Sequence, residues 1–263
     1  MDLGLKNRVA IVTGSSQGIG KAIAYGFAKE GANVTICART EDTLKATSKE
    51  IETMFGTEVL AFPANLKVKE NIQAMVKATA NKFGRIDILI NNTGGPPSAL
   101  FHETTDKDWQ ETFDSLLMSV IDCCREVIPH MKANKWGRII NMTSFVAKQP
   151  AERLVLSNAI RAGVLGLTKT LSNELAEYGI LVNAVCPGWT LTDRVERLAE
   201  SKAEKTGQDY EAIISEWTRS IALNRMAQPE EIANLVVFLA SEKASYMTGA
   251  VVQVDGGAIK SLI

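Results

Sequence analysis

The sequence predicts an α/β fold: a single-domain, doubly wound (Rossmann) parallel sheet of about seven strands. Short apolar runs rich in β-branched residues alternate along the chain with longer stretches of helical periodicity. A glycine-rich turn follows the first of these runs, where such folds bind their ligand. The length of 263 residues and the 46% share of hydrophobic residues fit one large domain, which we expect to span 1–263.

The predicted strands are almost continuously apolar, as expected for strands that are buried on both faces of a parallel sheet. In chain order they cover residues 8–14, 33–39, 58–64, 86–92, 137–144, 180–187 and 250–257. The predicted helices cover residues 19–30, 41–55, 68–83, 108–134, 154–178 and 229–240. The charged, amphipathic segment 190–226 interrupts this alternation after the sixth strand. We expect it to form one or two extra helices on the substrate side of the fold, where the crevice opens.

Composition and charge argue against several classes of partner. The formal net charge of −1 gives no basic surface for nucleic acid. No apolar run reaches membrane-spanning length and no signal peptide is evident at the N-terminus, so we expect a cytoplasmic protein without membrane contact. The cysteines show no metal-binding spacing, so we predict no metal site and expect them to pack in the core. They are Cys37, Cys123, Cys124 and Cys186.

The glycine-rich turn "TGSSQGIG" joins the first predicted strand to the first predicted helix. Gly14 allows the tight turn, Gly18 lets the backbone approach a pyrophosphate, and Gly20 permits close packing of helix on strand. The N-terminus of the following helix favours negative charge. A plain strand-to-helix turn would look similar, so the motif indicates a dinucleotide site only together with other motifs.

Four further motifs follow in order, and together the five resemble those of the short-chain dehydrogenase/reductase family over essentially the whole chain. They are "NNTG" at 91–94, "INMTS" ending at Ser144, "PGWTLT" at 187–192 and "VDGG" at 254–257. The segments "GRIIN", "GILVN" and "QPEEIANLVVFLASEKASYMTGAVVQVDGG" are most similar to the 3-oxoacyl-acyl-carrier-protein reductase-like members. The resemblance therefore implies an oxidoreductase that binds a nicotinamide cofactor and a small-molecule substrate.

The resemblance also implies where the cofactor would lie. Its phosphates would contact the backbone of 15–19, with the Ser15 and Ser16 hydroxyls as additional donors. Arg39, after the second strand, could pair with a 2′-phosphate, which favours NADP over NAD. Asn65 would accept from the adenine, and Thr192 would reach the nicotinamide amide. The complete set of implied cofactor contacts is Gly14, Ser15, Ser16, Gly18, Ile19, Gly20, Arg39, Asn65, Leu66, Asn91, Gly94, Arg161, Pro187, Gly188, Thr190 and Thr192.

The chain departs from the family at its catalytic positions. The family's YxxxK motif, counted from Ser144, falls on Ser157 and Arg161, and its catalytic asparagine falls on Leu116. Tyrosine is the family's proton donor and the lysine lowers its pKa, whereas a serine hydroxyl is far less acidic. Of the four family positions, this chain retains only Ser144. We take Ser144, Ser157 and Arg161 as its candidate catalytic residues.

Three interpretations of this site stay open from the sequence. In the first, Ser144 and Ser157 bind a carbonyl or hydroxyl, Arg161 holds the ribose, and water or the substrate supplies the proton. In the second, the crevice performs non-redox chemistry on an anionic substrate that Arg153 and Arg161 bind. In the third, the protein binds a nucleotide or partner without catalysis. The family resemblance also implies a homotetramer or homodimer, with 108–134 and 154–178 at its interfaces.

Overall fold

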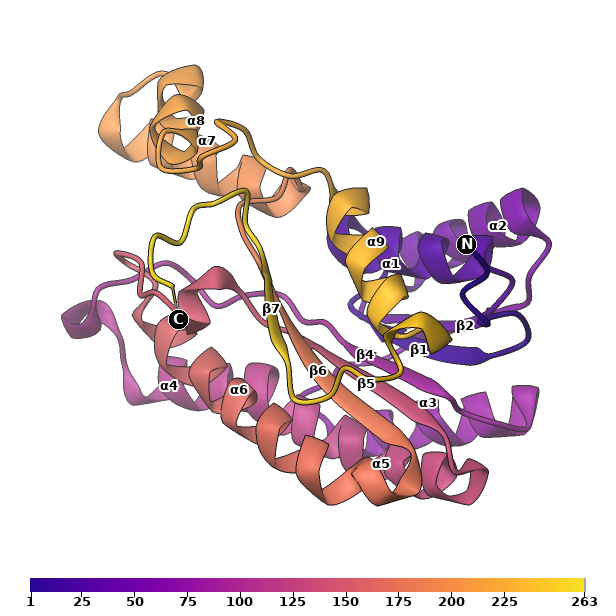
Figure 1. Cartoon of the computed structure of the whole chain (residues 1–263). Helices are drawn as coiled ribbons and strands as arrows, with labels where there is room; N and C mark the ends of the chain where they lie inside the picture. The colour runs from indigo at the N-terminus through magenta and orange to yellow at the C-terminus, as the bar shows by residue number, and fades with distance from the viewer. Residues whose placement is uncertain (263) are drawn as a thin grey trace.

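A parallel sheet runs through the molecule, with its strands in the order β3-β2-β1-β4-β5-β6-β7 (Figure 1). The computed structural model describes residues 1–262. All seven predicted strands are confirmed, and every neighbouring pair is parallel. The strands are β1 (Val9–Thr13), β2 (Asn33–Ala38), β3 (Val59–Pro63), β4 (Ile88–Asn91), β5 (Gly137–Met142), β6 (Ile180–Pro187) and β7 (Val251–Val254).

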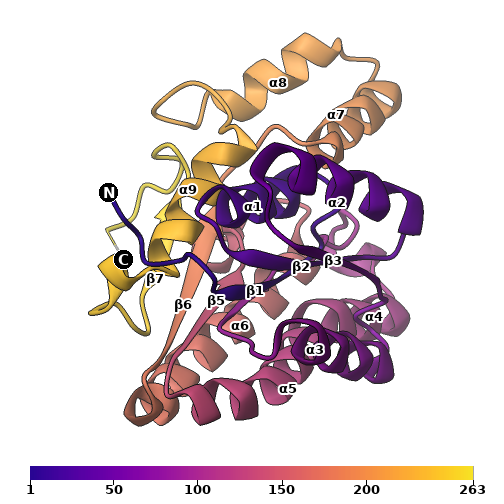
Figure 2. The ribbon, with the colours of Figure 1, turned by 90° about the vertical axis from the view of Figure 1, so that its right-hand side faces the viewer.

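Helices cover both faces of the sheet, as Figure 2 shows. One face carries α1 (Gly18–Lys29), α2 (Glu41–Phe55) and α9 (Pro229–Leu239), and the other carries α3 (Lys69–Phe83), α5 (Ser119–Asn134) and α6 (Val155–Leu175). Each layer encloses its own buried apolar cluster. Successive strand residues alternate between them, so Val12 packs in the first cluster and Ile11 in the second. This double burial explains the continuous apolar runs of the sequence.

The predicted helix over 108–134 is confirmed as helical backbone from Asp106 to Asn134, but the sequence did not predict the π-helical turn inside it. The segment divides into α4 (Asp106–Phe113), a π-helical turn over Asp114–Met118, and α5. Two serine hydroxyls donate to backbone carbonyls here, Ser115 to Thr112 at 3.2 Å and Ser119 to Ser115 at 2.6 Å, and such bonds favour helix irregularity. The extra residue of a π turn leaves apolar periodicity on either side intact, so the pattern did not reveal it.

The segment 190–226 forms two helices, α7 (Asp193–Thr206) and α8 (Tyr210–Thr218), in agreement with the predicted one or two. Figure 1 shows them at one end of the molecule, beyond the carboxyl ends of the strands. Their base is fastened by a bridge between Thr190 and Ala227. Both helices therefore stand over the edge of the sheet where ligands bind in this architecture.

The loops after β1 and β4 meet at the point where the strand order reverses. The Thr13 hydroxyl donates to the carbonyl of Asn92 at 2.8 Å and accepts from the Asn92 backbone N–H at 2.8 Å. The Asn92 side-chain amide donates to the carbonyls of Thr13 at 3.2 Å and Gly14 at 3.1 Å. These bonds hold the glycine-rich turn against the loop after β4, at the crevice of a doubly wound sheet.

The cysteines pack in the core as predicted: all four are buried, and none forms a disulfide. Within residues 1–262, no helix is long and apolar enough to cross a membrane. The same residues contain no group of three or more His, Cys, Asp or Glu side chains that could hold a metal ion.

Candidate active site

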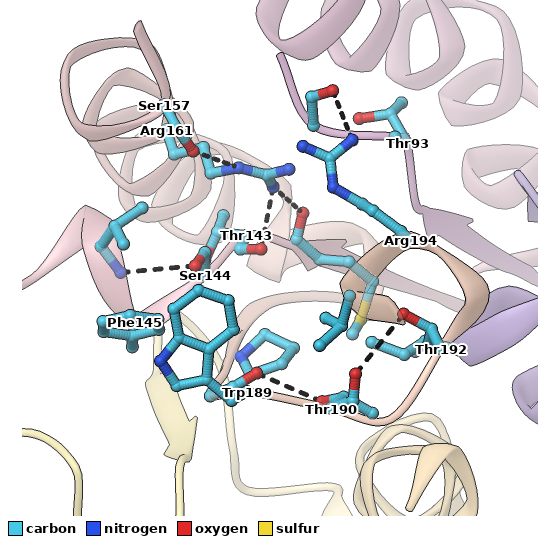
Figure 3. A pocket seen from close by; sticks show the side chains of 18 of the residues that line it. Thr93, Thr143, Ser144, Phe145, Ser157, Arg161, Trp189, Thr190, Thr192 and Arg194 are labelled. Carbon is cyan, nitrogen blue, oxygen red and sulfur yellow. Dashed lines mark hydrogen bonds between the residues drawn. The ribbon is translucent and has the colours of Figure 1, made fainter. Parts of the chain in front are cut away.

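A cavity of about 200 Å³ opens at the carboxyl ends of β4, β5 and β6 (Figure 3). Residues from five parts of the chain line it: the start of α1, the loop after β4, the end of β5, one face of α6, and the segment from Pro187 into α7. Ser144, Ser157 and Arg161, far apart in the sequence, therefore share one cavity with Ile19 of the glycine-rich turn.

The glycine-rich turn forms a cradle, a space that side chains at its glycine positions would fill. Gly14 and Gly18 adopt φ angles of 58° and 57°, which favour glycine. A Cβ atom on Gly20 would lie 2.1 Å from the carbonyl oxygen of Gly14. The backbone N–H groups of Gly18, Ile19 and Gly20 open α1, and no acceptor for them occurs within residues 1–262. The turn thus presents unpaired donors and the positive end of a helix, the arrangement that binds phosphate.

The two serines of this turn differ in their surroundings. The Ser15 hydroxyl donates to the Val12 carbonyl at 2.6 Å and accepts from the Cys37 backbone N–H at 2.9 Å. It is fully buried, so it holds β1 against β2 rather than facing the crevice. The Ser16 side chain is half-buried, and its hydroxyl has no hydrogen-bond partner within residues 1–262. Only Ser16 has the free hydroxyl that the sequence led us to expect of both.

Arg39 lies exposed directly after β2, and it makes no ion pair within the described part of the chain. Asn65 follows β3; its side-chain oxygen already accepts from the Lys67 backbone N–H at 3.1 Å. Leu66 packs against the second apolar cluster. The free cation at the end of β2 matches the place where the resemblance puts a 2′-phosphate.

Asn91 does not face the cavity. Its side-chain amide donates to Asn141 Oδ1 at 2.9 Å and to Cys124 Sγ at 3.5 Å, in the core beneath the carboxyl end of β4. Gly94 does line the cavity, and a Cβ atom there would have no neighbour within 4 Å. The "NNTG" motif therefore supplies core packing at its first residue and cavity wall at its last.

The segment after β6 supplies the opposite wall. Pro187, Gly188, Thr190 and Thr192 all line the cavity. The Thr190 hydroxyl donates to the Gly188 carbonyl at 3.2 Å, and the Thr192 hydroxyl donates to the Thr190 carbonyl at 3.4 Å. A Cβ atom on Gly18 would lie 3.2 Å from the Thr192 methyl group, so this segment closes over the glycine-rich turn.

Ser157 and Arg161 lie one helical turn apart on the buried face of α6. The Arg161 Nε–H donates to Ser157 Oγ at 3.1 Å, and Nη1 donates to the carbonyls of Met142 at 3.2 Å and Thr143 at 2.8 Å. Ser144 Oγ accepts from the Val146 backbone N–H at 3.4 Å. Each serine oxygen is thus used as an acceptor, which leaves each hydroxyl hydrogen free to donate to a ligand.

The cavity carries positive charge without a counter-acid. No Asp or Glu lines it, and Arg161 forms no ion pair within residues 1–262. Burial lowers the pKa of Arg161 to about 10, helped by the positive charge of Arg194, while Cys186 has the opposite effect. Arg161 is therefore still charged at neutral pH.

Arg194, at the start of α7, is a site residue that the sequence did not reveal. Its Nη1 donates to the Gly95 carbonyl at 2.7 Å and its Nη2 to the Pro96 carbonyl at 2.8 Å, so it links α7 to the loop after β4. Burial lowers its pKa, and so does the charge of Arg197. Figure 3 shows its guanidinium turned toward the same part of the cavity as that of Arg161. In an amphipathic segment rich in charged residues, no spacing marks one arginine as inward-facing.

The structure places no proton donor of the family's kind in the cavity. Leu116 is buried in the π-helical turn and does not line the cavity. None of the tyrosines within residues 1–262 lines it either. Phe145 and Trp189 instead provide an aromatic wall, with ring centroids 6.1 Å apart, and Trp189 stacks on Trp217 of α8 at 4.7 Å.

Each comparison with known proteins finds reductases that are similar to this chain. A family model described as enoyl-(acyl carrier protein) reductase matches residues 14–258. The 3-oxoacyl-[acyl-carrier-protein] reductase of Staphylococcus epidermidis is 36% identical over 252 residues, which is 95% of this chain and 98% of the relative. That of Thermotoga maritima is 36% identical over 255 residues, 97% of this chain and 99% of the relative.

Solved structures extend the likeness to the whole fold. L-sorbose reductase from Gluconobacter frateurii, complexed with NADPH and L-sorbose, is 36% identical and superposes with a TM-score of 0.96 over 100% of both chains. A variant of actinorhodin polyketide ketoreductase with NADPH is 33% identical, with a TM-score of 0.92 over 97% of this chain and 98% of that chain.

The cradle makes a first prediction. Gly20→Ala should lower the free energy of unfolding by ~1–3 kcal/mol, since the new methyl group overlaps the Gly14 carbonyl in a packed turn. Gly94→Ala is the matched control, because open space surrounds that position. Urea unfolding followed by circular dichroism measures both. Equal stability of the two variants would contradict the close approach of α1 to β1.

Proposed function

This chain belongs to the short-chain dehydrogenase/reductase family, and we propose that it is an NADPH-dependent oxidoreductase that reduces the carbonyl group of a small molecule. One observation carries the proposal: the phosphate-binding cradle at α1 opens into the same cavity as two serine hydroxyls that are free to donate. NADPH complexes among the similar solved structures support the choice of cofactor.

The residues present fit this cofactor. The backbone of 15–19 and the Ser16 hydroxyl would hold the pyrophosphate, because the glycines of the turn leave room for it. Arg39 would pair with the 2′-phosphate, and Asn65 and Leu66 would lie beside the adenine. Arg161 would contact the ribose, and the segment from Pro187 to Thr192 would hold the nicotinamide amide. When bound, NADPH supplies the hydride that reduces the carbonyl carbon.

The serine hydroxyls would hold the carbonyl oxygen of the substrate. Ser144 and Ser157 each donate one hydrogen bond to this oxygen, and the bonds strengthen as negative charge develops on it. Arg161 contributes a fixed positive charge behind Ser157, 3.1 Å from its oxygen. Because its pKa of about 10 keeps Arg161 protonated at neutral pH, the alkoxide takes its proton from a water molecule. We expect this route to be slower than protonation by a phenol.

The remaining features extend the proposal. A negatively charged substrate fits the two cavity arginines, which face no acid. A cytoplasmic location, and a homotetramer or homodimer formed through the segments 108–134 and 154–178, stay predictions from the sequence. The same holds for the interpretation of 190–226 as a substrate-side insertion in a domain spanning 1–263.

The absence of a tyrosine from the cavity walls favours a second candidate, a protein that binds NADPH without turnover. Fluorescence titration with NADPH tests binding, and NADPH oxidation in the presence of small ketones, aldehydes and oxo acids tests turnover. Binding with no turnover of any of these substrates would select the second candidate. A protein that does not bind NADPH would contradict both candidates.

If turnover occurs, Ser157→Ala should lower kcat by ~10²–10³, the usual loss of one donor to a developing oxyanion. Ser144→Ala should have a similar effect, whereas the affinity for NADPH should stay within a few-fold in both variants. Ser245→Ala is the control, because Ser245 is exposed and does not line the cavity. Unchanged kcat in both cavity variants would remove the hydroxyls from the mechanism.

Arg39 should set the cofactor preference. Arg39→Asp removes the cation for the 2′-phosphate and adds an acceptor for ribose hydroxyls, so NADPH should bind ~10- to 100-fold more weakly and NADH more tightly. Arg219→Asp, at an exposed position directly after α8, serves as the control. Parallel titrations with both cofactors measure the effect. An unchanged ratio of affinities would show that Arg39 does not contact the cofactor.

Turnover should also depend on the charge of Arg161. Since burial and Arg194 lower its pKa to about 10, kcat/KM should fall as the pH rises through that value and Arg161 loses its proton. Arg194→Gln removes a neighbouring positive charge, which favours the protonated form of Arg161, so this alkaline limb should move to higher pH. Profiles of both proteins provide the test. A limb at the same pH in both would contradict the coupling.

A further inference from the structure

The cavity holds two guanidinium groups, and their bonding differs. Arg161 is 8% exposed, and its hydrogen bonds fix Ser157 and the end of β5. Arg194 is half-buried and bonded only to two neutral backbone carbonyls. Neither has a carboxylate partner within residues 1–262, although buried arginines are generally paired. A charged ligand can therefore engage Arg194 without breaking the bonds of Arg161 to Ser157 and to the end of β5.

The geometry around Arg194 suits a carboxylate. Its two terminal nitrogens already hold two neighbouring oxygens, those of Gly95 and Pro96, at 2.7 and 2.8 Å. This is the fork that arginine presents to the paired oxygens of a carboxylate, and bonds to a charged acceptor are roughly twice as strong as those to a neutral one. The carboxylate of a ligand can replace these carbonyls as the acceptor. It can also accept from the Arg194 N–H groups that the carbonyls do not use.

The position of the Arg194 guanidinium depends on the absence of a side chain at Gly95. A Cβ atom on Gly95 would lie 2.7 Å from Arg194 Nη2 and 3.0 Å from its Cζ atom. A side chain at position 95 would therefore push the guanidinium away from this loop. A second hollow, lined by Arg194 and Arg197 with Gly95, Pro96, Pro97 and Leu198, adjoins the cavity and also contains no acid. Arg194 thus stands between an outer cationic hollow and the inner cavity.

One wall of the cavity is apolar. Phe145 and Trp189 form its aromatic wall, and Leu154, Val195 and Leu198 also line it. A ligand that fills it needs an apolar body, a carbonyl oxygen for the serine hydroxyls, and an anion for Arg194. The cavity of about 200 Å³ also includes the walls that would hold the nicotinamide, so only a small substrate fits beside it.

We propose that the substrate is a small oxo acid with an apolar or aromatic body, and that Arg194 binds its carboxylate. This inference rests on the proposed function, because the oxo group is the one to be reduced. Arg194 is a specificity residue: it holds the carboxylate, while Ser144 and Ser157 hold the oxygen that is reduced.

The test compares acids with their neutral esters. The probes are phenylpyruvate, 4-methyl-2-oxopentanoate and 3-oxohexanoate, each paired with its methyl ester, on the full chain saturated with NADPH. At least one acid should exceed its ester in kcat/KM by ~10- to 100-fold, the worth of a charged, bidentate contact. Acids and esters that react equally well, in every pair, would overturn the proposal.

Variants then assign the contact. Arg194→Gln should raise KM for the preferred acid by ~10- to 100-fold, change kcat less, and raise KM for the ester by a clearly smaller factor. Arg194→Lys keeps the charge but not the fork, so it should recover part of the loss. Gly95→Ala should resemble Arg194→Gln, because it displaces the guanidinium. Arg219→Gln is the control, because Arg219 is exposed directly after α8 and does not line the cavity. Equal losses for acid and ester in Arg194→Gln would overturn the assignment.

Calorimetry separates this inference from the proposed function. The same acids are titrated into the protein with NADP⁺ and without any cofactor, so that carboxylate binding is measured whether or not turnover occurs. Binding of an acid that weakens in Arg194→Gln but not in Arg219→Gln supports the role of Arg194, even if the protein reduces nothing. If no acid binds the wild-type protein in either state, the inference fails while NADPH binding stands on its own titration.

Discussion

The charge of Arg161 is the constraint on which the rest of the site depends. A guanidinium this deeply buried is costly, and no carboxylate within residues 1–262 offsets the cost. Hydrogen bonds to Met142, Thr143 and Ser157 compensate in part, and in doing so they fasten α6 to the carboxyl end of β5. Any ligand that brings negative charge into the cavity supplies what the protein itself lacks.

The charge of Arg161 changes how the reaction of this family can proceed. The family resemblance implies a phenol whose pKa a neighbouring lysine lowers, whereas here a serine hydroxyl lies beside a guanidinium that keeps its proton at neutral pH. Under the proposed function, the site would stabilise an oxyanion well and protonate it poorly. A second cation, Arg194, adds to the positive potential from the α7 side. Both features favour an anionic substrate over a neutral one.

The sheet could be predicted because strands that are buried on both faces appear in the sequence as continuous apolar runs. It also predicted that Ser144, Ser157 and Arg161 meet, through the spacing of family motifs. Side-chain direction was not predictable: Ser15 lies in the glycine-rich turn and Asn91 at the end of β4, as expected, yet their side chains bond to the core. Arg194 was not predicted as a site residue because its inward position arises from a tertiary contact with Gly95. The local periodicity of the sequence does not show such a contact.

We propose that hydride transfer from NADPH occurs at this site although no phenol lines it. The most direct measurement uses NADPH deuterated at C4, in each of its two stereoisomers, with phenylpyruvate as acceptor and mass spectrometry of the product. Hydride transfer should give a hydroxy acid that carries one deuterium from one stereoisomer and none from the other. Unchanged phenylpyruvate, recovered together with intact deuterated NADPH from a protein that binds both, would contradict it.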